Sequence, residues 1–261
     1  MTTRQSFLKR GRTRLLRDLS ILLRQPSFLL EYLAFRSASR KAERNMEVPF
    51  RGWVPIIEDR TKNTPVEPHY TYFPAWAARI LAATKPARHV DISSYLPFST
   101  LISSFIPIQF FDYRPAKIKL ESLTMGECDL MKLDFPDASI TSLSCMHVIE
   151  HIGLGRYGDK MDAMGDVTAI NELIRVLAPG GDLLFVVPMG APRVQFNAHR
   201  IYAYKEIVQR FSGLALKSFT LIPDNALEVG MILGADESLC DRQKWGCGCF
   251  WFQKPSAQSV I

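Results

Sequence analysis

The sequence predicts an α/β protein with a doubly wound, mostly parallel sheet of about seven strands, preceded by an N-terminal helical arm. Two observations support this prediction. From residue 85 onward, short apolar runs alternate with segments of helical periodicity. In addition, the apolar runs at 140–146 and 182–187 are separated by a helical segment that ends at Pro179-Gly180-Gly181. A crossover of that length carries a helix, so the two strands are expected to be parallel neighbours.

The other elements follow from the same patterns. We expect helices at residues 75–83, 98–105, 166–177 and 203–211. We expect strands at residues 88–93, 108–113, 120–125, 140–146, 182–187, 214–221 and 249–253. The last strand follows a longer excursion, so it is expected to return antiparallel beside its predecessor. Residues 46–75 are rich in proline and aromatic residues, which favours an irregular connection or a lid.

The charge is distributed unevenly along the 261 residues. The formal net charge is +6, whereas residues 1–45 carry 11 Lys and Arg against Asp18, Glu31 and Glu43, a net charge of +8. The basic character therefore belongs to the N-terminal segment. We divide the chain into a basic amphipathic helical arm (1–45), a proline-rich and aromatic-rich connection or lid (46–84) and an α/β domain (85–261).

The arm has the pattern of an amphipathic helix. Leu15, Leu19 and Leu22 follow helical spacing, and a second apolar face begins after Pro26. A basic helix of this kind can lie on an anionic membrane surface, and it is equally suited to pack on the core or on a second subunit of a homo-oligomer. Nucleic acid is disfavoured as a partner, because the aromatic residues lie on the apolar face and not among the arginines. No convincing signal peptide or membrane-spanning run is present, which favours a cytoplasmic protein, either free or peripheral at the inner membrane face.

Five cysteines are present, and they form no CxxC pair. Their odd number and their spacing favour reduced thiols in a cytosolic compartment. A zinc site built from Cys240, Cys247, Cys249 and a histidine is an alternative, although this spacing matches none of the usual zinc knuckles. Buried or surface thiols are the favoured interpretation.

A cluster of ionisable residues follows the strand at 140–146. His147, Glu150 and His151 come directly after it, and ligands of such sheets bind beyond the carboxyl ends of the strands. A His or a His–Glu pair can act as the base in a group transfer near neutral pH. The same three residues could instead hold a divalent metal or form the cleft wall. We assign them as candidate catalytic residues and predict no metal ligand.

Residues 85–254 resemble the class I S-adenosylmethionine-dependent methyltransferases. The resemblance is carried by HVDIS at 89–93, FFDY at 110–113, GECDLMKLDFPDASITSLSCMHVIEHI at 126–152 and LIRVLAPGGDLLFVVP at 173–188. HVIEHIGLGRYGD at 147–159 and FNAHRIY at 196–202 are most similar to an uncharacterised bacterial branch of that superfamily, often found among surface-polysaccharide genes.

The resemblance implies S-adenosylmethionine as the cofactor and gives roles to the strand-end residues. Asp91 matches the acid near the methionine part of the cofactor, and Asp112 matches the acid that accepts hydrogen bonds from the ribose hydroxyls. Asp129 matches the acid near the adenine amino group, with Leu130 as a wall beside the ring. Ser93 takes the place of the first glycine of the cofactor loop. That loop, residues 93–97, contains no glycine, whereas members of the superfamily usually have several.

The leading hypothesis is O-methylation of a sugar or glycan intermediate in surface-polysaccharide biosynthesis. The expected binding residues for an anionic or sugar acceptor are Arg156, Tyr157, Asn197, His199 and Arg200. Two alternatives remain. One is a non-catalytic methyltransferase-like domain that binds a partner or glycan and scaffolds a glycan assembly system, and the other is a nucleotide-sugar-using enzyme on the same sheet.

Overall fold

The structure of the protein is a computed structural model that describes residues 26–42, 46–52, 54, 56 and 59–256. Contacts divide the chain into two compact units, residues 1–66 and residues 67–261. This division falls inside the segment 46–84 that the sequence indicates as a connection or lid. The parts of the predicted arm at 1–25 and 43–45 lie outside the described residues.

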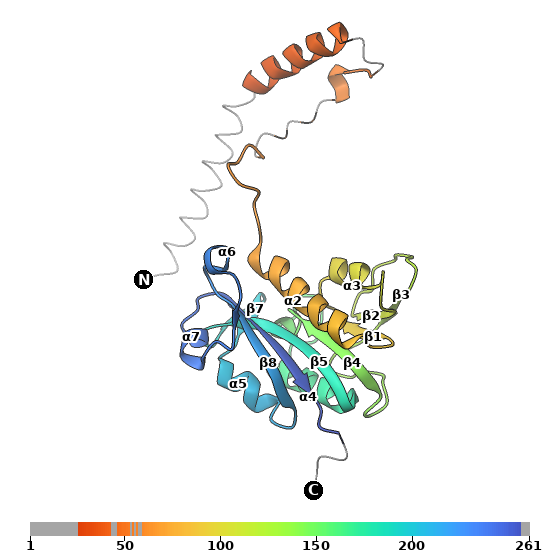
Figure 1. Cartoon of the computed structure of the whole chain (residues 1–261), viewed down its shortest axis with the longest axis vertical. Helices are drawn as coiled ribbons and strands as arrows, with labels where there is room; N and C mark the ends of the chain where they lie inside the picture. The colour runs from red at the N-terminus through yellow and green to blue at the C-terminus, as the bar shows by residue number, and fades with distance from the viewer. Residues whose placement is uncertain (1–25, 43–45, 53, 55, 57–58, 257–261) are drawn as a thin grey trace. The chain divides into compact units, whose positions relative to one another are not determined.

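The second unit is built on an eight-stranded sheet with the order β3-β2-β1-β4-β5-β10-β8-β9 (Figure 1). The strands are β1 (His89–Ile92), β2 (Ile108–Asp112), β3 (Leu123–Glu127), β4 (Ile140–Met146), β5 (Leu177–Met189), β8 (Ala215–Ile222), β9 (Ile232–Leu233) and β10 (Gly246–Gln253). Strands β1 to β5 pair in parallel, and β10 runs antiparallel to both β5 and β8. The mostly parallel sheet and the antiparallel return of the last strand are therefore confirmed. The additional strand is β9, a two-residue edge strand that is too short to produce a pattern in the sequence.

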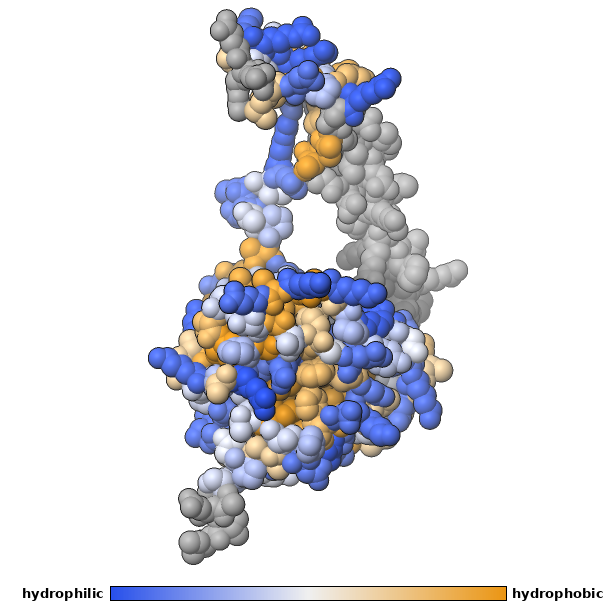
Figure 2. Space-filling view, turned by 90° about the vertical axis from the view of Figure 1, so that its right-hand side faces the viewer, coloured by the Kyte–Doolittle hydropathy of each residue, from blue (hydrophilic) through white to orange (hydrophobic). Residues whose placement is uncertain are grey.

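Helices cover both faces of the sheet. One apolar cluster joins one face to α2 (Pro68–Thr84), α3 (Leu96–Ile102) and the short α6 (Ala226–Val229). A second cluster joins the other face to α4 (Gly165–Val176), α5 (Tyr204–Arg210) and the short α7 (Glu237–Asp241). Successive residues of β5 alternate between the two clusters, with Leu183 and Phe185 in one and Leu184 and Val186 in the other. Figure 2 shows that apolar residues also gather in the middle of one outer face of this unit, inside a hydrophilic border.

Helix α2 corrects the prediction of a short helix at 75–83 after an irregular segment. The helix begins at Pro68, in a position where a missing N–H breaks no intrahelical bond. The Oε2 atom of Glu67 caps this end by accepting a hydrogen bond from the backbone N–H of Tyr70 at 2.7 Å. The residues that α2 buries have helical spacing: His69, Phe73, Trp76, Ala77 and Leu81.

Strand β5 is also longer than predicted. It begins at Leu177 and includes Pro179-Gly180-Gly181, which the sequence indicates as a turn. The register between β4 and β5 shifts between Ile140 and Ser142, at the level of this segment. The backbone N–H of Gly180 donates to the carbonyl of Lys254 at 2.8 Å, so this segment pairs at the end of the sheet.

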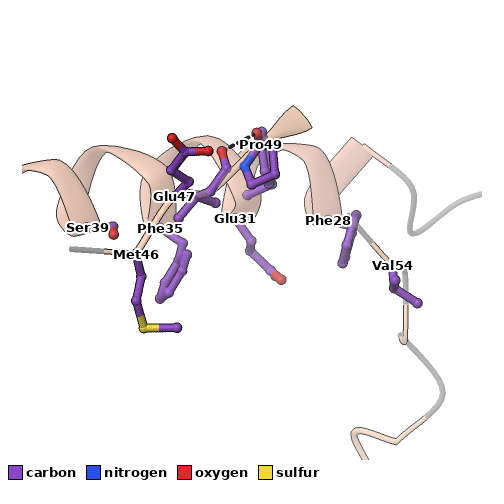
Figure 3. A pocket seen from close by; sticks show the side chains of 10 residues that line it. Phe28, Glu31, Phe35, Ser39, Met46, Glu47, Pro49 and Val54 are labelled. Atoms are coloured by element: carbon purple, nitrogen blue, oxygen red, sulfur yellow. Dashed lines mark hydrogen bonds between the residues drawn. The ribbon is translucent and has the colours of Figure 1, made fainter. Parts of the chain in front are cut away.

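The first unit contains a helix at residues 26–41 and a short 3-10 helix, η1 (Phe50–Gly52). The hydroxyl of Tyr32 donates to the carbonyl of Val48 at 3.2 Å, and Arg60 pairs with Glu31. An apolar hollow of about 450 Å³ lies between the helix and residues 46–54, and it is lined by side chains that include Phe28, Phe35, Met46 and Val54 (Figure 3). Outside the hollow, Leu30 is 68% exposed and Leu33 is 49% exposed. Within the described part of the chain, no helix has the length and apolar character needed to cross a bilayer.

Candidate functional site

Two neighbouring cavities lie at the carboxyl ends of β1 and β4, where the strand order of the sheet reverses. The first, which we call the polar chamber, has a volume of about 420 Å³. It is lined by Glu67, His69, Tyr70, Ser93, Ser94, Tyr95, Leu96, Met146, His147, Glu150, His151, Arg156, Tyr157, His199 and Trp245. The second, the apolar chamber, has a volume of about 130 Å³ and lies beside the ends of β2 and β3. Ser93 and Tyr157 line both chambers, so the two chambers adjoin, and we call them together the cleft.

The loop after β1 turns at a serine in the left-handed region. Ser93 has a φ of 56°, a conformation that normally favours glycine. Its backbone N–H donates to the carbonyl of Phe111 at 2.7 Å, which ties the loop to β2. The Oγ atom of the buried Ser94 accepts a hydrogen bond from the backbone N–H of Met146 at 3.0 Å, which ties the same loop to β4. The loop therefore makes a glycine-like turn although it contains no glycine.

Asp91 lies beneath this loop and is completely buried. Its Oδ1 atom accepts from the backbone N–H of Ser94 at 3.0 Å, and its Oδ2 atom accepts from the hydroxyl of Ser99 at 2.9 Å. Burial raises the pKa of Asp91 to about 6, although the hydrogen bonds from serine residues oppose this rise. Asp91 is not among the residues that line either chamber, since one of its oxygens binds the loop and the other binds Ser99 on α3. Its predicted contact with the cofactor stays a prediction.

The other predicted cofactor residues surround the apolar chamber. Asp129 and the buried Leu130 line it directly, together with Ser93. The Oδ1 atom of Asp129 accepts from the backbone N–H of Met131 at 2.9 Å. Asp112 ends β2 and accepts a hydrogen bond from the backbone N–H of Arg114, but it is the next residue, Tyr113, that lines the chamber. The structure thus brings Ser93, Asp129 and Leu130 together, with Asp112 one residue away.

A buried histidine–carboxylate pair lies on the polar side of the cleft. The Nδ1 atom of His147 is 2.8 Å from the Oε1 atom of Glu150, and the side chains are 4% and 1% exposed. Burial raises the pKa of Glu150, but the charge of His147 and its hydrogen bond outweigh this effect, so the net pKa is lowered. Among the described residues, the Nε2 atom of His147 and the Oε2 atom of Glu150 are buried without a hydrogen-bond partner.

His151 is more accessible than His147, and a second partner fixes its ring. Its Nδ1 atom lies 2.6 Å from the carbonyl of Ala198, so this nitrogen carries the proton and donates it. Its Nε2 atom lies 3.8 Å from the Oε1 atom of Glu150. Burial lowers the pKa of His151, although Glu150 opposes this, so the neutral ring is favoured.

The loop that follows carries two of the predicted acceptor residues into the cleft. Arg156 donates to the same Ala198 carbonyl at 3.0 Å, and its guanidinium lies 5.2 Å from the ring centre of Tyr157. The Oδ1 atom of Asp159 accepts from the backbone N–H of Tyr157, and its Oδ2 atom accepts from that of Gly153. These bonds within the loop hold Tyr157 at the boundary of the chambers and Arg156 at the polar chamber.

The remaining acceptor candidates lie on the hairpin of β6 (Arg193–Gln195) and β7 (His199–Ile201), and only one of them lines a chamber. His199 lines the polar chamber, with its ring 4.2 Å from that of Trp245. Arg200 is buried and turned away, because its Nη1 atom donates to the carbonyl of Ile152 at 2.6 Å and its Nε atom lies 3.5 Å from Asp166. Asn197 is exposed at the turn, with a φ of 61°, and neither Asn197 nor Arg200 lines a chamber.

Four residues that line the polar chamber come from outside the strand ends and loops to which the sequence interpretation assigned site residues. Glu67, His69 and Tyr70 lie at the start of α2, and Trp245 precedes β10. The Nε2 atom of His69 is 2.9 Å from the carbonyl of Trp245, and its ring stacks on those of Trp245 and His147. Burial and the neighbouring His147 lower the pKa of His69 to about 4. The helical spacing of the buried residues of α2 was the signal that could have located this helix in the sequence.

Comparisons with known proteins agree with the fold. The sequence model of a family described as "Caenorhabditis protein of unknown function, DUF268" matches residues 130–229. Comparison with curated proteins finds no match. Among solved structures, a putative methyltransferase from Bacillus halodurans C-125 aligns with a TM-score of 0.51 at 12% identity, over 70% of this chain and 99% of its own. The second unit therefore has the fold of a Rossmann-like methyltransferase.

Two further structures align less closely. The N-methyltransferase NodS from Bradyrhizobium japonicum WM9, solved with S-adenosyl-L-homocysteine, has a TM-score of 0.48 at 16% identity, over 70% of this chain and 88% of its own. The MccD protein has a TM-score of 0.49 at 14% identity, over 73% of this chain and all of its own.

Proposed function

We propose that the protein is an S-adenosylmethionine-dependent methyltransferase that methylates a hydroxyl group of a sugar or glycan. The observation that carries this proposal is that the two chambers adjoin and share Ser93 and Tyr157 as lining residues. One side of that cleft has the chemistry of a nucleoside site, and the other has a histidine–carboxylate cluster. A methyl donor that spans both sides would present its methyl group to an acceptor in the polar chamber.

The lining of the apolar chamber suits an adenosine group. Leu130, Val148 and Ile152 supply apolar walls for the adenine ring, and Asp129 supplies a carboxylate at the chamber edge. Ser93 gives the loop after β1 the turn that a glycine would give, so the backbone can pass close to the cofactor. When bound, S-adenosylmethionine supplies an electrophilic methyl group on its sulfonium.

The polar chamber suits a sugar better than a flat apolar acceptor. Aromatic side chains at its wall, such as Tyr70, Tyr95 and Trp245, can pack against the C–H face of a sugar ring. Arg156 and Glu67 can exchange hydrogen bonds with sugar hydroxyls or with an anionic group on a glycan. These residues support a glycan acceptor and, with it, a role in polysaccharide biosynthesis.

His151 is the base in this proposal. Its Nδ1–H donates to Ala198, which leaves the lone pair on Nε2 to accept the proton of the acceptor hydroxyl. The Nε2 atom of His151 would take the proton of the acceptor hydroxyl as the acceptor oxygen takes the methyl group that the bound cofactor would supply. Glu150 stabilises the imidazolium that forms, and His147 is a positioning residue that orients Glu150.

Calorimetry with S-adenosylhomocysteine tests the cofactor site, and transfer of labelled methyl groups to a carbohydrate fraction tests the reaction. We expect label that survives mild alkali, because a methyl ether is stable where a methyl ester is hydrolysed. His151→Asn keeps an amide donor for Ala198 but removes the base, so kcat is expected to fall about 10²–10⁴-fold with unchanged binding of S-adenosylhomocysteine. Lys205→Gln, at an exposed position of α5, is the control.

Two results would remove this proposal. Absence of binding of both S-adenosylmethionine and S-adenosylhomocysteine at millimolar concentration would leave a non-catalytic binding domain as the better description. Tight binding of nucleotide-sugars in competition with S-adenosylmethionine would instead favour a nucleotide-sugar enzyme.

A further inference from the structure

Three side chains that can bind a metal converge beside the polar chamber, which two of them line. They are His69 from α2, His147 from the loop after β4, and Cys247 from β10. All three are buried, and one ligand atom of each lies within 4.8 Å of the others. Atoms bound to one tetrahedral zinc ion lie roughly 3.3 to 3.7 Å apart, so closing this cluster around a metal needs shifts of about an ångström.

The hydrogen bonds of His147 leave one nitrogen for a ligand. Its Nδ1 atom lies 2.8 Å from the Oε1 atom of Glu150, so in the neutral ring Nδ1 donates this hydrogen bond and Nε2 carries the lone pair. Among the residues that the structure describes, this Nε2 atom is buried and has no hydrogen-bond partner. A buried acceptor without a partner is unfavourable, and a metal ion would satisfy it. A carboxylate behind a histidine is also the usual arrangement behind a metal-binding imidazole.

His69 is oriented in the same way by a different partner. Its Nε2 atom lies 2.9 Å from the carbonyl of Trp245, and a carbonyl only accepts, so Nε2 carries the proton. The Nδ1 atom of His69 therefore has the free lone pair. Both histidines thus have one nitrogen held by an oxygen acceptor and the other nitrogen available for a metal.

Cys247 completes a set of two imidazoles and one sulfur. Burial raises the pKa of its thiol well above the ordinary value, so the thiol keeps its proton until a metal displaces it. Two imidazoles with one thiolate suit Zn²⁺ better than the hard cations Mg²⁺ and Ca²⁺. We propose that His69, His147 and Cys247 bind one zinc ion, with Glu150 and the Trp245 carbonyl as the outer partners of the two histidines.

This site would have two consequences for the protein. The ligands come from residues 69, 147 and 247, so the metal would fasten the start of α2 and the loop after β4 to β10. Three protein ligands also leave one tetrahedral position, and His69 and His147 line the polar chamber, so that position would open toward this chamber. The inference concerns metal binding alone and does not depend on methyl transfer.

Metal analysis of the full chain, purified without chelators and then titrated with Zn²⁺, tests the proposal. We expect about one zinc per chain. Cys247→Ala is expected to weaken zinc binding at least tenfold, whereas Cys145→Ala, an equally buried cysteine on β4 outside the cluster, is expected to bind zinc as the natural protein does. Replacement of zinc by Co²⁺ should give a thiolate-to-cobalt charge-transfer band in the natural protein and in Cys145→Ala.

The spectrum of the natural protein decides the proposal even if Cys247→Ala fails to fold. A cobalt complex without a thiolate band, or no zinc binding tighter than millimolar, would overturn it. Equal zinc affinity of the two cysteine variants would overturn it as well. Any of these results would leave the methyltransferase proposal untouched, because that proposal is tested by the binding of S-adenosylhomocysteine.

Discussion

The buried carboxyl group of Asp91 should make the stability of the protein depend on pH in an unusual direction. Burial raises its pKa from 3.8 to about 6 in the folded chain. A folded-state pKa that is higher than the unfolded one means that the folded protein binds the proton more tightly. The stabilising effect of this group is therefore fully present below about pH 4 and is lost as the pH rises through about 6. At one pKa unit per 1.36 kcal/mol, the loss amounts to about 3 kcal/mol.

Asp91→Asn removes this titration and keeps a side chain of similar shape. We expect the free energy of unfolding of the natural protein, relative to the variant, to fall by about 3 kcal/mol between pH 3 and pH 7. Urea unfolding followed by tryptophan fluorescence at several pH values measures this difference. Asp134→Asn, at an exposed position, is the control for the loss of one carboxylate.

A stability difference between the natural protein and Asp91→Asn that is independent of pH would contradict this prediction. A gain in the stability of the natural protein relative to the variant as the pH rises would contradict it as well. The second result would mean that the hydrogen bonds from Ser94 and Ser99 outweigh burial and hold the carboxylate in its charged form.

Two other predictions concern the loop after β4 and the N-terminal arm. Gly153→Ala should destabilise the protein by more than about 2 kcal/mol, because Gly153 has a φ of 75° and a Cβ atom would lie 2.1 Å from the carbonyl oxygen of Asp162. Gly158 has a similar φ of 84°, but a Cβ atom added there would have no atom within 4 Å, so Gly158→Ala should lower the free energy of unfolding by only about 1 kcal/mol. Chemical denaturation measures both changes, and equal losses in the two variants would contradict the proposed clash at Gly153. We also propose that the arm binds anionic membranes, since Leu30 and Leu33 are exposed on a helix that carries basic residues. Removal of residues 1–45 should then abolish co-sedimentation with anionic vesicles and leave the α/β unit folded, whereas unchanged co-sedimentation would reject the membrane role.

The sequence predicted the sheet because its signals are local. Each strand of the parallel core is a short apolar run bounded by turn residues, and both of its faces are covered. The residues directly after those strands were found for the same reason. His147 and Glu150 must lie at the carboxyl edge once β4 is assigned.

The side of a strand to which a residue points was harder to predict. His199 and Arg200 are neighbours on β7, and only one of two neighbours can point into the chamber. His199 does so, while Arg200 binds the carbonyl of Ile152 and lies near Asp166. Both residues are polar, so no alternation of apolar and polar residues indicated which of them was buried.

The contribution of α2 could not be predicted from local patterns alone. Its first turn lies in a segment whose prolines favour an irregular structure, yet Pro68 is compatible with a helix start. The contact between His69 and Trp245 joins residues 176 positions apart, and Cys247 lies two residues further on. Such a cluster exists only after the sheet has brought β4 and β10 to the two sides of β5.

The loop without glycine explains how the two halves of the cleft are coupled. A serine in the left-handed region costs roughly 1 kcal/mol, and hydrogen bonds between the loop and the ends of β1, β2 and β4 offset this cost. One of these bonds runs from Ser94 to Met146, the residue directly before His147. The conformation of the loop beside the apolar chamber is therefore fixed by the strand end that carries His147 into the polar chamber. A glycine loop could move independently of that strand, whereas here a displacement of either side must break a buried hydrogen bond.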